Sequence, residues 1–270
     1  FADQITLSLD EAIKDGADMA IVASPAPFHA LHAKLFLLAG IPTLIEKPVT
    51  SNSQDVYELI KINKDACTPT AVGYCLRYMP SAIKIKELLD QKIIGCIYNA
   101  FVNVGQYLPD WRPLIDYRNS VSAKANLGGG ALLELSHEID YIQWFLGSMK
   151  VHYAQLRSSS ELDLEVEELV DLVLVSDAGT VCNIHLDFLQ KKASRVCSFI
   201  GEKGRLDWDL ISNTITLHTD EGSEVLFSES NWDSNQIYLS LLTDFLDLVA
   251  GRENSSVDLE QARKTLELIE

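Results

Sequence analysis

The sequence predicts an α/β chain in two parts, a small parallel β-sheet followed by an α/β domain with a large, mostly antiparallel sheet. Two patterns predict this fold class. Short apolar runs alternate with helical patterns over residues 19–74, which is typical of right-handed β-α-β units. A series of short strand patterns joined by tight turns follows over residues 150–227, which is typical of an antiparallel sheet.

Composition limits the class of protein. The 270 residues include 22 Lys and Arg against 39 Asp and Glu, a formal charge of −17, and 47% are hydrophobic. This predicts a soluble globular chain with room for two domains. The acidity disfavours binding to nucleic acid or to anionic membrane surfaces. Five scattered cysteines, an odd number, favour reduced thiols in a cytoplasmic protein over a disulfide framework.

Residues 1–76 are predicted to be the C-terminal part of a dinucleotide-binding domain. A short helix is expected within 5–16, capped by Ser8 or Asp10. The elements that follow are a strand at 19–23, a helix at 27–39, a strand at 42–46, a helix beginning at Ser51 or Ser53, and a strand at 70–74. This β-α-β-α-β order is half of a doubly wound nucleotide-binding fold.

The glycine pattern that cradles a dinucleotide is absent from this half. The 14 glycines contain no G-x-G-x-x-G motif, and the nearest cluster, Gly128–Gly130, lies far downstream. The first apolar strand also needs a neighbour on its open edge. We therefore expect a β-α-β segment with the phosphate-binding glycines to precede Phe1.

Residues 77–270 are predicted to form a second domain for substrate binding and oligomerisation. Besides the strands of 150–227, its expected elements are a helix at 81–91, an alternating run at 94–108, a helix at 131–146, and helices at about 235–250 and 258–269. Polar residues Asn183, His185 and Asp187 alternate with apolar ones, which predicts one packed and one more polar sheet face. The open face suits an oligomer interface, so we expect a homodimer or homotetramer.

Lys47 stands where open α/β sheets bind their ligands. The Glu46-Lys47-Pro48 tripeptide directly follows a buried parallel strand, at its carboxyl end. An ammonium group there can approach a substrate oxygen. A solvated loop lysine is the alternative interpretation.

His137 is the candidate general acid or base. On the predicted helix 131–146, spacings of three place Glu134, His137 and Asp140 on one face, with Tyr141 and Trp144 beside them. A histidine oriented by a carboxylate can transfer a proton near neutral pH. The alternatives are a structural His-Asp pair and half of a di-iron motif. The second half of that motif is missing, so no metal is expected.

Weaker candidates come from side-chain chemistry alone. Arg77 and Arg112 could grip a phosphate, and the indole of Trp111 could wall a planar ring. The Gly128–Gly130 run before a helix could form an anion nest, although close backbone packing is the favoured use.

Taken together and in register, these motifs resemble the Gfo/Idh/MocA family of NAD(P)-dependent oxidoreductases over nearly the whole chain. The residues that carry the resemblance are Ser24-Pro25-x-x-x-His29, Glu46-Lys47-Pro48, Tyr74-x-x-Arg77-x-x-Pro80, Trp111-Arg112-Pro113 and Gly128-Gly-Gly-x-x-x-Glu134-x-x-His137-x-x-Asp140.

The resemblance implies a Rossmann-type domain that binds NAD or NADP and a substrate that is a sugar, sugar derivative or cyclic polyol. It implies catalytic roles for Lys47 and His137, and for Glu134 as the acidic partner, although many members place that acid four positions before the histidine, where this chain has Leu133. The residues that it assigns to the cofactor are Ser24, Pro25, His29, Glu46, Lys47, Pro48, Arg77, Trp111 and Arg112.

The implied mechanism moves a hydride between the nicotinamide and a secondary hydroxyl. His137 would accept the hydroxyl proton, and Lys47 would stabilise the developing oxyanion. Two alternatives on the same fold stay open. One is a non-catalytic dinucleotide-binding regulator or scaffold, and the other is an enzyme that uses transient oxidation to cleave a glycoside.

Overall fold

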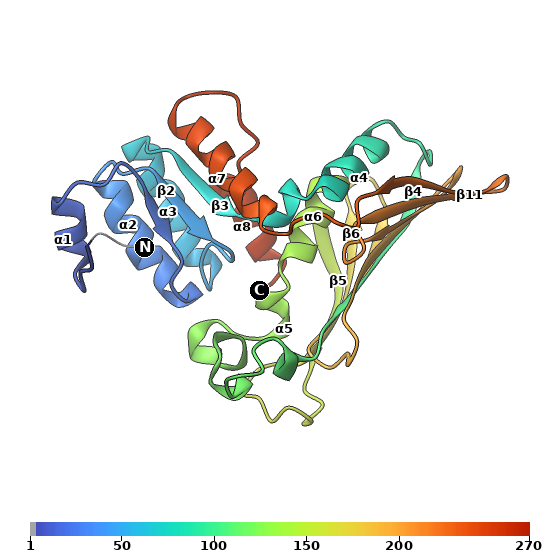
Figure 1. The fold of residues 1–270 in the computed structure, drawn as a ribbon, viewed down its shortest axis with the longest axis horizontal. Coiled ribbons are helices and arrows are strands. Elements are labelled where there is room, and N and C mark those ends of the chain that lie inside the picture. Colours follow the sequence, from blue (N-terminus) through green and yellow to red (C-terminus); the bar gives the residue numbers. More distant parts are fainter. Residues whose placement is uncertain (1–3) are drawn as a thin grey trace. The chain divides into compact units, whose positions relative to one another are not determined.

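A computed structural model describes residues 4–270 of the chain (Figure 1). The chain divides into two compact units: one contains the N-terminal part up to Tyr74 together with Tyr238–Leu268, and the other contains Cys75–Ile237. Within the described range, no helix is both long and apolar enough to cross a membrane.

The first unit is built on a three-stranded parallel sheet in the order β1-β2-β3. Its elements before Tyr74 are α1 (Leu9–Lys14), β1 (Ala20–Val22), α2 (His29–Leu38), β2 (Thr43–Glu46), α3 (Ser53–Ala66) and β3 (Thr70–Gly73). The predicted β-α-β-α-β order is therefore confirmed. Ser8 caps α1 by accepting the amide of Glu11. The expected cap of α3 was wrong, because Asn52 rather than either serine accepts the amide of Asp55.

The two C-terminal helices pack with the first unit, whereas the expected division at residue 76 placed them in the second domain. The helices are α7 (Gln236–Val249) and α8 (Leu259–Glu267), and residues 238–268 belong to the first unit. Tyr57 of α3 donates a hydrogen bond to Glu267 over 2.6 Å, and Val257 bridges to Val72 of β3. Hydrophobic periodicity shows that a helix needs a partner but not which sheet supplies it.

The second unit contains an eight-stranded sheet in the order β11-β10-β9-β8-β4-β7-β6-β5. Its strands are β4 (Ile97–Gly105), β5 (Met149–Arg157), β6 (Leu169–Ser176), β7 (Val181–Asp187), β8 (Ser194–Gly201), β9 (Gly204–Asp209), β10 (Thr214–Thr219) and β11 (Gly222–Ser228). All neighbouring pairs are antiparallel except β4 with β7. The predicted large, mostly antiparallel sheet is confirmed.

Helices cover one face of this large sheet. They are α4 (Pro80–Asp90), α5 (Ala131–Glu134) and α6 (His137–Leu146), and Figure 1 shows α4 and α6 lying along the sheet. Aromatic rings fill the space between α6 and the strands: Tyr141 and Phe145 pack edge-on against Trp208, with centroids 5.2 and 5.8 Å away. Burial of such rings is the main stabilising contribution in a core of this kind.

A buried ion pair ties α6 to the short helical turn Cys75–Tyr78. The guanidinium of Arg77 donates from Nε and Nη2 to the two carboxylate oxygens of Asp140, over 2.8 and 2.7 Å. Only 11% of the Arg77 side chain and 2% of the Asp140 side chain are exposed. Because neither charge could find water if its partner were removed, the pair holds the two segments in one register.

On the other face of the sheet, His185 of β7 lies between two aspartates. Its Nδ1 is 2.7 Å from Asp171 and its Nε2 is 3.1 Å from Asp187. Hydrogen bonds to Asp187 and then to Asp171 raise the pKa of His185 to about 9. Partial burial raises the pKa of Asp171 and of Asp187. Hydrogen bonds, first of all those with His185, outweigh burial, so both pKa values lie below the ordinary value.

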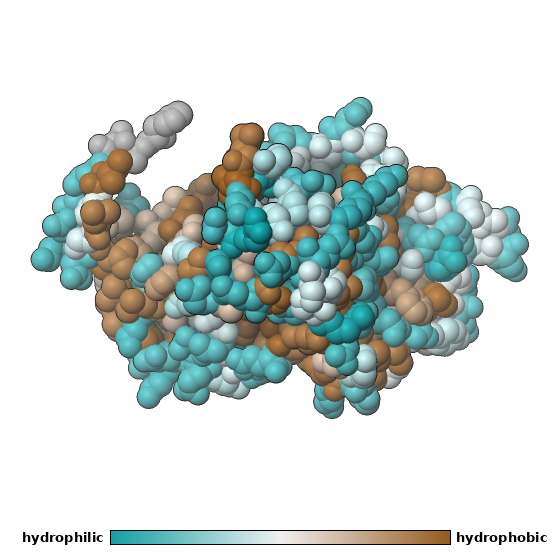
Figure 2. Space-filling model, turned by 90° about the horizontal axis from the view of Figure 1, so that it is seen from below, coloured by the Kyte–Doolittle hydropathy of each residue, from teal (hydrophilic) through white to brown (hydrophobic). Residues whose placement is uncertain are grey.

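The surface agrees with the acidic composition. On the face drawn in Figure 2, hydrophilic residues cover much of the visible area and hydrophobic residues form patches between them. Exposed apolar side chains of the first unit include Leu7, Ile21 of β1 and Leu31 of α2.

Replacing Arg77 by Met should destabilise the second unit. The change strands the buried Asp140 carboxylate, so we expect the free energy of unfolding to fall by about 3–5 kcal/mol. All four tryptophans lie within residues 75–237, so their fluorescence during urea denaturation reports on this unit. The matched control is Arg157→Met, which breaks an exposed pair with Asp171 and should cost about 1 kcal/mol or less. Equal losses in the two variants would contradict the assignment.

The His185 cluster should stabilise the fold in a pH-dependent manner. The pKa of about 9 in the folded state lies above the ordinary value of 6.5, so the contribution is complete below that value and is lost as the pH rises through 9. The difference in urea midpoint between the natural protein and a His185→Gln variant should be larger at about pH 6 than at about pH 10. A difference that stays constant over this range would rule out the pairing.

Candidate active site

The first unit gathers many of the predicted cofactor residues at one edge of its sheet. β1 and β2 pair in parallel, so both end at the same edge. Ser24 and Pro25 follow β1, and Lys47 and Pro48 directly follow β2. Pro48 is buried, whereas the other three are half-buried. This carboxyl edge is where parallel sheets of the doubly wound type receive their ligands.

Glu46 contributes to the order of this edge. Its carboxylate Oε2 accepts the amide N–H of Lys47 over 3.3 Å. The same carboxylate lies against Gly73 at the end of β3, where an added Cβ would be 3.1 Å from Oε2. A side chain at position 73 would therefore crowd the group that holds the Lys47 amide.

His29 and Ser24 are both engaged by the protein itself. His29 is only 1% exposed, and its ring lies 2.9 Å from the carbonyl oxygen of Pro48 and 2.5 Å from that of Ser24. The Ser24 hydroxyl is 3.0 Å from Nδ1 of His32. Both ring nitrogens therefore face backbone carbonyls, and the expected contact of His29 with the cofactor stays a prediction.

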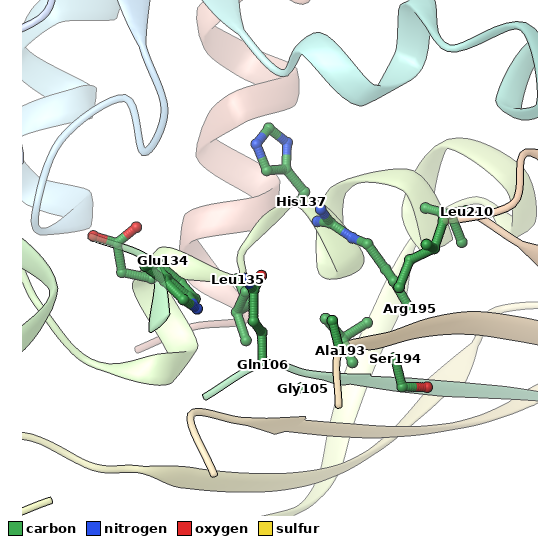
Figure 3. A pocket seen from close by; sticks show the side chains of 12 residues that line it. Gly105, Gln106, Glu134, Leu135, His137, Ala193, Ser194, Arg195 and Leu210 are labelled. Carbon is green, nitrogen blue, oxygen red and sulfur yellow. The ribbon is translucent and has the colours of Figure 1, made fainter. Parts of the chain in front are cut away.

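The second unit contains a cavity of about 460 Å³ that includes three of the predicted site residues, Trp111, Glu134 and His137 (Figure 3). Its lining comes from the end of β4, the loop after it, the α5–α6 region, the start of β8 and the turn after β9. The full lining is Val104, Gly105, Gln106, Trp111, Glu134, Leu135, His137, Ala193, Ser194, Arg195, Leu210 and Ile211. The cavity thus combines apolar walls with a few polar groups, as small-molecule sites do.

Glu134 and His137 do not lie on one continuous helix, contrary to the expectation. The predicted helix 131–146 is broken between α5 and α6, because Leu135 leaves the helical region with ψ of 28°. The Glu134 carboxylate accepts a hydrogen bond from the Ser122 hydroxyl over 3.0 Å. Figure 3 shows the two side chains pointing in different directions. A helical spacing of three therefore does not describe this pair.

Asp140 and Arg77, two further residues singled out in the sequence, pair with each other. Asp140 lies one turn after His137 on α6, but its two oxygens are taken by Arg77. The Arg77 guanidinium also lies 5.6 Å from the ring centre of Trp144. The planar guanidinium of Arg77 is thus matched to a carboxylate, and its expected contact with a cofactor phosphate stays a prediction.

Sequence reasoning missed a second ion pair at the cavity. Arg195, at the start of β8, lines the cavity and lies 2.7 Å from the fully buried carboxylate of Glu138 on α6. Burial would lower the pKa of Arg195, but the Glu138 charge outweighs this and raises it. Glu138 carried one signal, a charge on the apolar side of an amphipathic helix. Nothing in the sequence indicated the role of Arg195, because its partner Glu138 is distant in sequence.

The glycine run before α5 packs against backbone, as the sequence favoured. A Cβ at Gly129 would lie 2.5 Å from the carbonyl oxygen of Val121. The amide of Leu132, at the start of α5, donates to the carboxylate of Glu167 over 2.9 Å. Burial raises the pKa of that carboxyl group. The chain's own acidic side chain therefore occupies the place that an anion would take.

The remaining predicted residues lie on the loop after β4. Trp111 packs edge-on against Phe188 with ring centres 5.4 Å apart, and Arg112 is exposed. Over residues 4–270, no group of three or more His, Cys, Asp or Glu side chains could hold a metal ion.

Comparison with curated proteins gives dehydrogenases. The chain is 26% identical over 207 residues to inositol 2-dehydrogenase 1 of Saccharopolyspora erythraea, covering 74% of this chain and 57% of that protein. It is 25% identical over 202 residues to trans-1,2-dihydrobenzene-1,2-diol dehydrogenase of Oryctolagus cuniculus, covering 73% and 57%. The chain thus spans less than two thirds of the length of these relatives.

Solved structures share the fold. An NAD binding oxidoreductase from Klebsiella pneumoniae superposes with a TM-score of 0.84 at 17% identity, covering 98% of this chain and 79% of that one. At this identity the likeness establishes the fold alone.

Family models match both units in sequence order. Residues 2–74 match the oxidoreductase family with an NAD-binding Rossmann fold, and residues 82–207 match the GFO/IDH/MocA C-terminal domain. The resemblance carried by the motifs is therefore confirmed, and the chain belongs to the Gfo/Idh/MocA family of NAD-binding oxidoreductases.

Proposed function

We propose that this protein is an NAD(P)-dependent dehydrogenase or reductase acting on a secondary hydroxyl of a sugar, sugar derivative or cyclic polyol. The observation that carries the proposal is the pairing of two features in one chain of this family. Lys47 follows β2 at the ligand edge of a parallel sheet, and His137 lines a cavity of small-molecule size. The names of the inositol and dihydrodiol dehydrogenases support a hydroxyl-bearing substrate.

The residues at the carboxyl edge fit the nicotinamide end of the cofactor. The turn after β1 is Ser24-Pro25-Ala26-Pro27 and carries no glycine, so it lacks the features of a pyrophosphate cradle. Ser24, Pro25, Glu46 and Lys47 instead offer half-buried polar and apolar surface for a ribose and a ring. Trp111 and Arg112, on the loop after β4, are also proposed as cofactor-binding residues. The nicotinamide, when bound, supplies the hydride acceptor or donor.

The chain's own groups would handle the proton and the oxygen. His137 is half-buried, which leaves its ring accessible from the cavity that it lines. In this proposal it takes the proton of the substrate hydroxyl, and the Lys47 ammonium stabilises the oxygen as negative charge develops. Both roles depend on groups held in place before substrate binds, so that no reorganisation is needed during the reaction.

The proposal also covers the oligomeric state and the cellular location of the protein. We propose a homodimer or homotetramer that forms through the open face of the large sheet. That face presents apolar groups such as Phe101 and Ile200 beside polar ones such as His185. A cytoplasmic location is proposed because five scattered cysteines, an odd number, favour reduced thiols over a disulfide framework.

A screen for cofactor reduction tests the proposed function. Purified protein is mixed with NAD or NADP and with polyols, aldoses, uronates or nucleotide sugars, and the absorbance of reduced nicotinamide is followed. Substrate-dependent reduction supports a dehydrogenase. Release of a sugar with recycled cofactor would instead identify the glycoside-cleaving alternative, and cofactor binding without any product would identify the regulator.

Lys47→Met and His137→Ala should each lower kcat by about a hundredfold or more on a confirmed substrate, because each removes a group that acts in the transition state. Lys34→Met serves as the control. It removes a lysine of the same unit that pairs with Glu58 on the surface, and it should keep the natural rate. Natural rates in both site variants would eliminate the proposed mechanism.

Glu134→Gln should have a smaller effect than His137→Ala. Its carboxylate accepts from Ser122 and is separated from His137 by the break before α6. We expect a loss in kcat of about tenfold or less, below the range of direct proton transfer. Comparison of kcat for the two variants on one substrate checks this, and a loss as large as that of His137→Ala would restore Glu134 to a direct role.

A further inference from the structure

The Lys47 segment is anchored on both sides of the lysine. On one side, the Lys47 amide donates to the Glu46 carboxylate over 3.3 Å. On the other side, Nδ1 of His29 lies 2.9 Å from the carbonyl oxygen of Pro48, within hydrogen-bonding distance. The residues that follow, Val49 and Thr50, are fully buried. The backbone at Lys47 therefore has little freedom to move as long as these contacts persist.

His29 also holds the neighbouring loop. Its Nε2 lies 2.5 Å from the carbonyl oxygen of Ser24. Ser24 follows β1 and Pro48 follows β2, and these strands are adjacent in the parallel sheet. One imidazole ring thus bridges the two loops that leave the ligand edge of the sheet.

The chemistry of the ring suits this bridging role. Carbonyl oxygens only accept hydrogen bonds, so a ring nitrogen that carries a proton donates to the carbonyl that it faces. His29 is 1% exposed and is the first residue of α2, so its backbone is fixed by the helix. A buried carbonyl that loses its donor has no water to replace it.

We propose that His29 is a positioning residue, a buried clamp that sets the place of Lys47 and of the Ser24-Pro25 loop without touching substrate. The inference rests on the proposed function for its catalytic meaning, since it is through Lys47 that His29 would affect turnover. Errors of about 1 Å in the placement of a catalytic group can cost a hundredfold in rate.

The test compares His29→Ala with Leu37→Ala. Leu37 lies on the same helix and is fully buried among apolar residues, so its truncation also weakens α2 but leaves both carbonyl bonds intact. Amide hydrogen exchange, measured by mass spectrometry without cofactor, reports on the two loops directly. We expect exchange within residues 23–28 and 46–52 to be faster in His29→Ala, and to be unchanged in Leu37→Ala relative to the rest of the first unit.

Kinetics supply the second readout. On a confirmed substrate, kcat should fall by about tenfold to a hundredfold in His29→Ala and stay within about twofold in Leu37→Ala. His29→Gln, whose amide can donate to one of the two carbonyls, should fall between His29→Ala and the natural protein.

Two results would overturn the clamp. One is unchanged exchange of both loops in His29→Ala, and the other is an equal loss of kcat in His29→Ala and Leu37→Ala. Absence of turnover in the natural protein would overturn the proposed function instead, and the exchange comparison would still decide whether His29 holds the loops.

Discussion

The buried pair between Arg77 and Asp140 is the contact on which the candidate site of the second unit depends most. It fixes α6 at a point one turn from His137, and it does so with two parallel hydrogen bonds rather than with apolar packing alone. Apolar contacts between a helix and a sheet tolerate small slides, whereas a bidentate pair defines both distance and orientation. A second pair, between Arg195 and Glu138, joins the same helix to β8. His137 therefore begins a helix that is held by charge on two sides.

The first unit reaches a similar result with contacts to its backbone. Glu46 holds the Lys47 amide, and His29 lies against the carbonyl oxygens of Pro48 and Ser24. In both units the candidate catalytic side chain is half-buried, and buried groups help to hold its segment: His29 in the first unit, and Glu138 and Asp140 in the second. Such an arrangement suits catalysis, because a group that acts on a transition state has to be in place before the reaction begins.

Much of the fold could be predicted from the sequence because its signals are local. Alternating short apolar runs and helical patterns placed the strands of the parallel sheet, and tight turns placed those of the large sheet. The assignment of residues 238–268 to the second domain differed because α8 returns to β3 and α3, and amphipathic periodicity does not identify a distant partner. The break before α6 was missed because Leu135 and Ser136 are compatible with a helix, and the bend depends on tertiary contacts.

The candidate site was predictable in part, and for the same reason. Lys47 and His137 were found from short motifs, and the structure places each at a ligand edge or a cavity. The pairing of Arg77 with Asp140 was not foreseen, because a guanidinium that suits a phosphate suits a carboxylate equally well. The role of Arg195 could not be predicted from the sequence, because it depends on a contact with Glu138, which lies 57 positions away in the chain. Long-range polar contacts of this kind are the part of a site that only a structure reveals.

The central proposal is that Lys47 and His137 both take part in the reaction of the substrate hydroxyl, and a double-mutant cycle tests it most directly. The values of kcat/KM for Lys47→Met, His137→Ala and the double variant are measured on one confirmed substrate. Groups that act as a unit lose most of their effect once either is removed. We predict that the double variant is about as slow as the slower single variant. A double variant whose loss is the product of the two single losses would contradict the account.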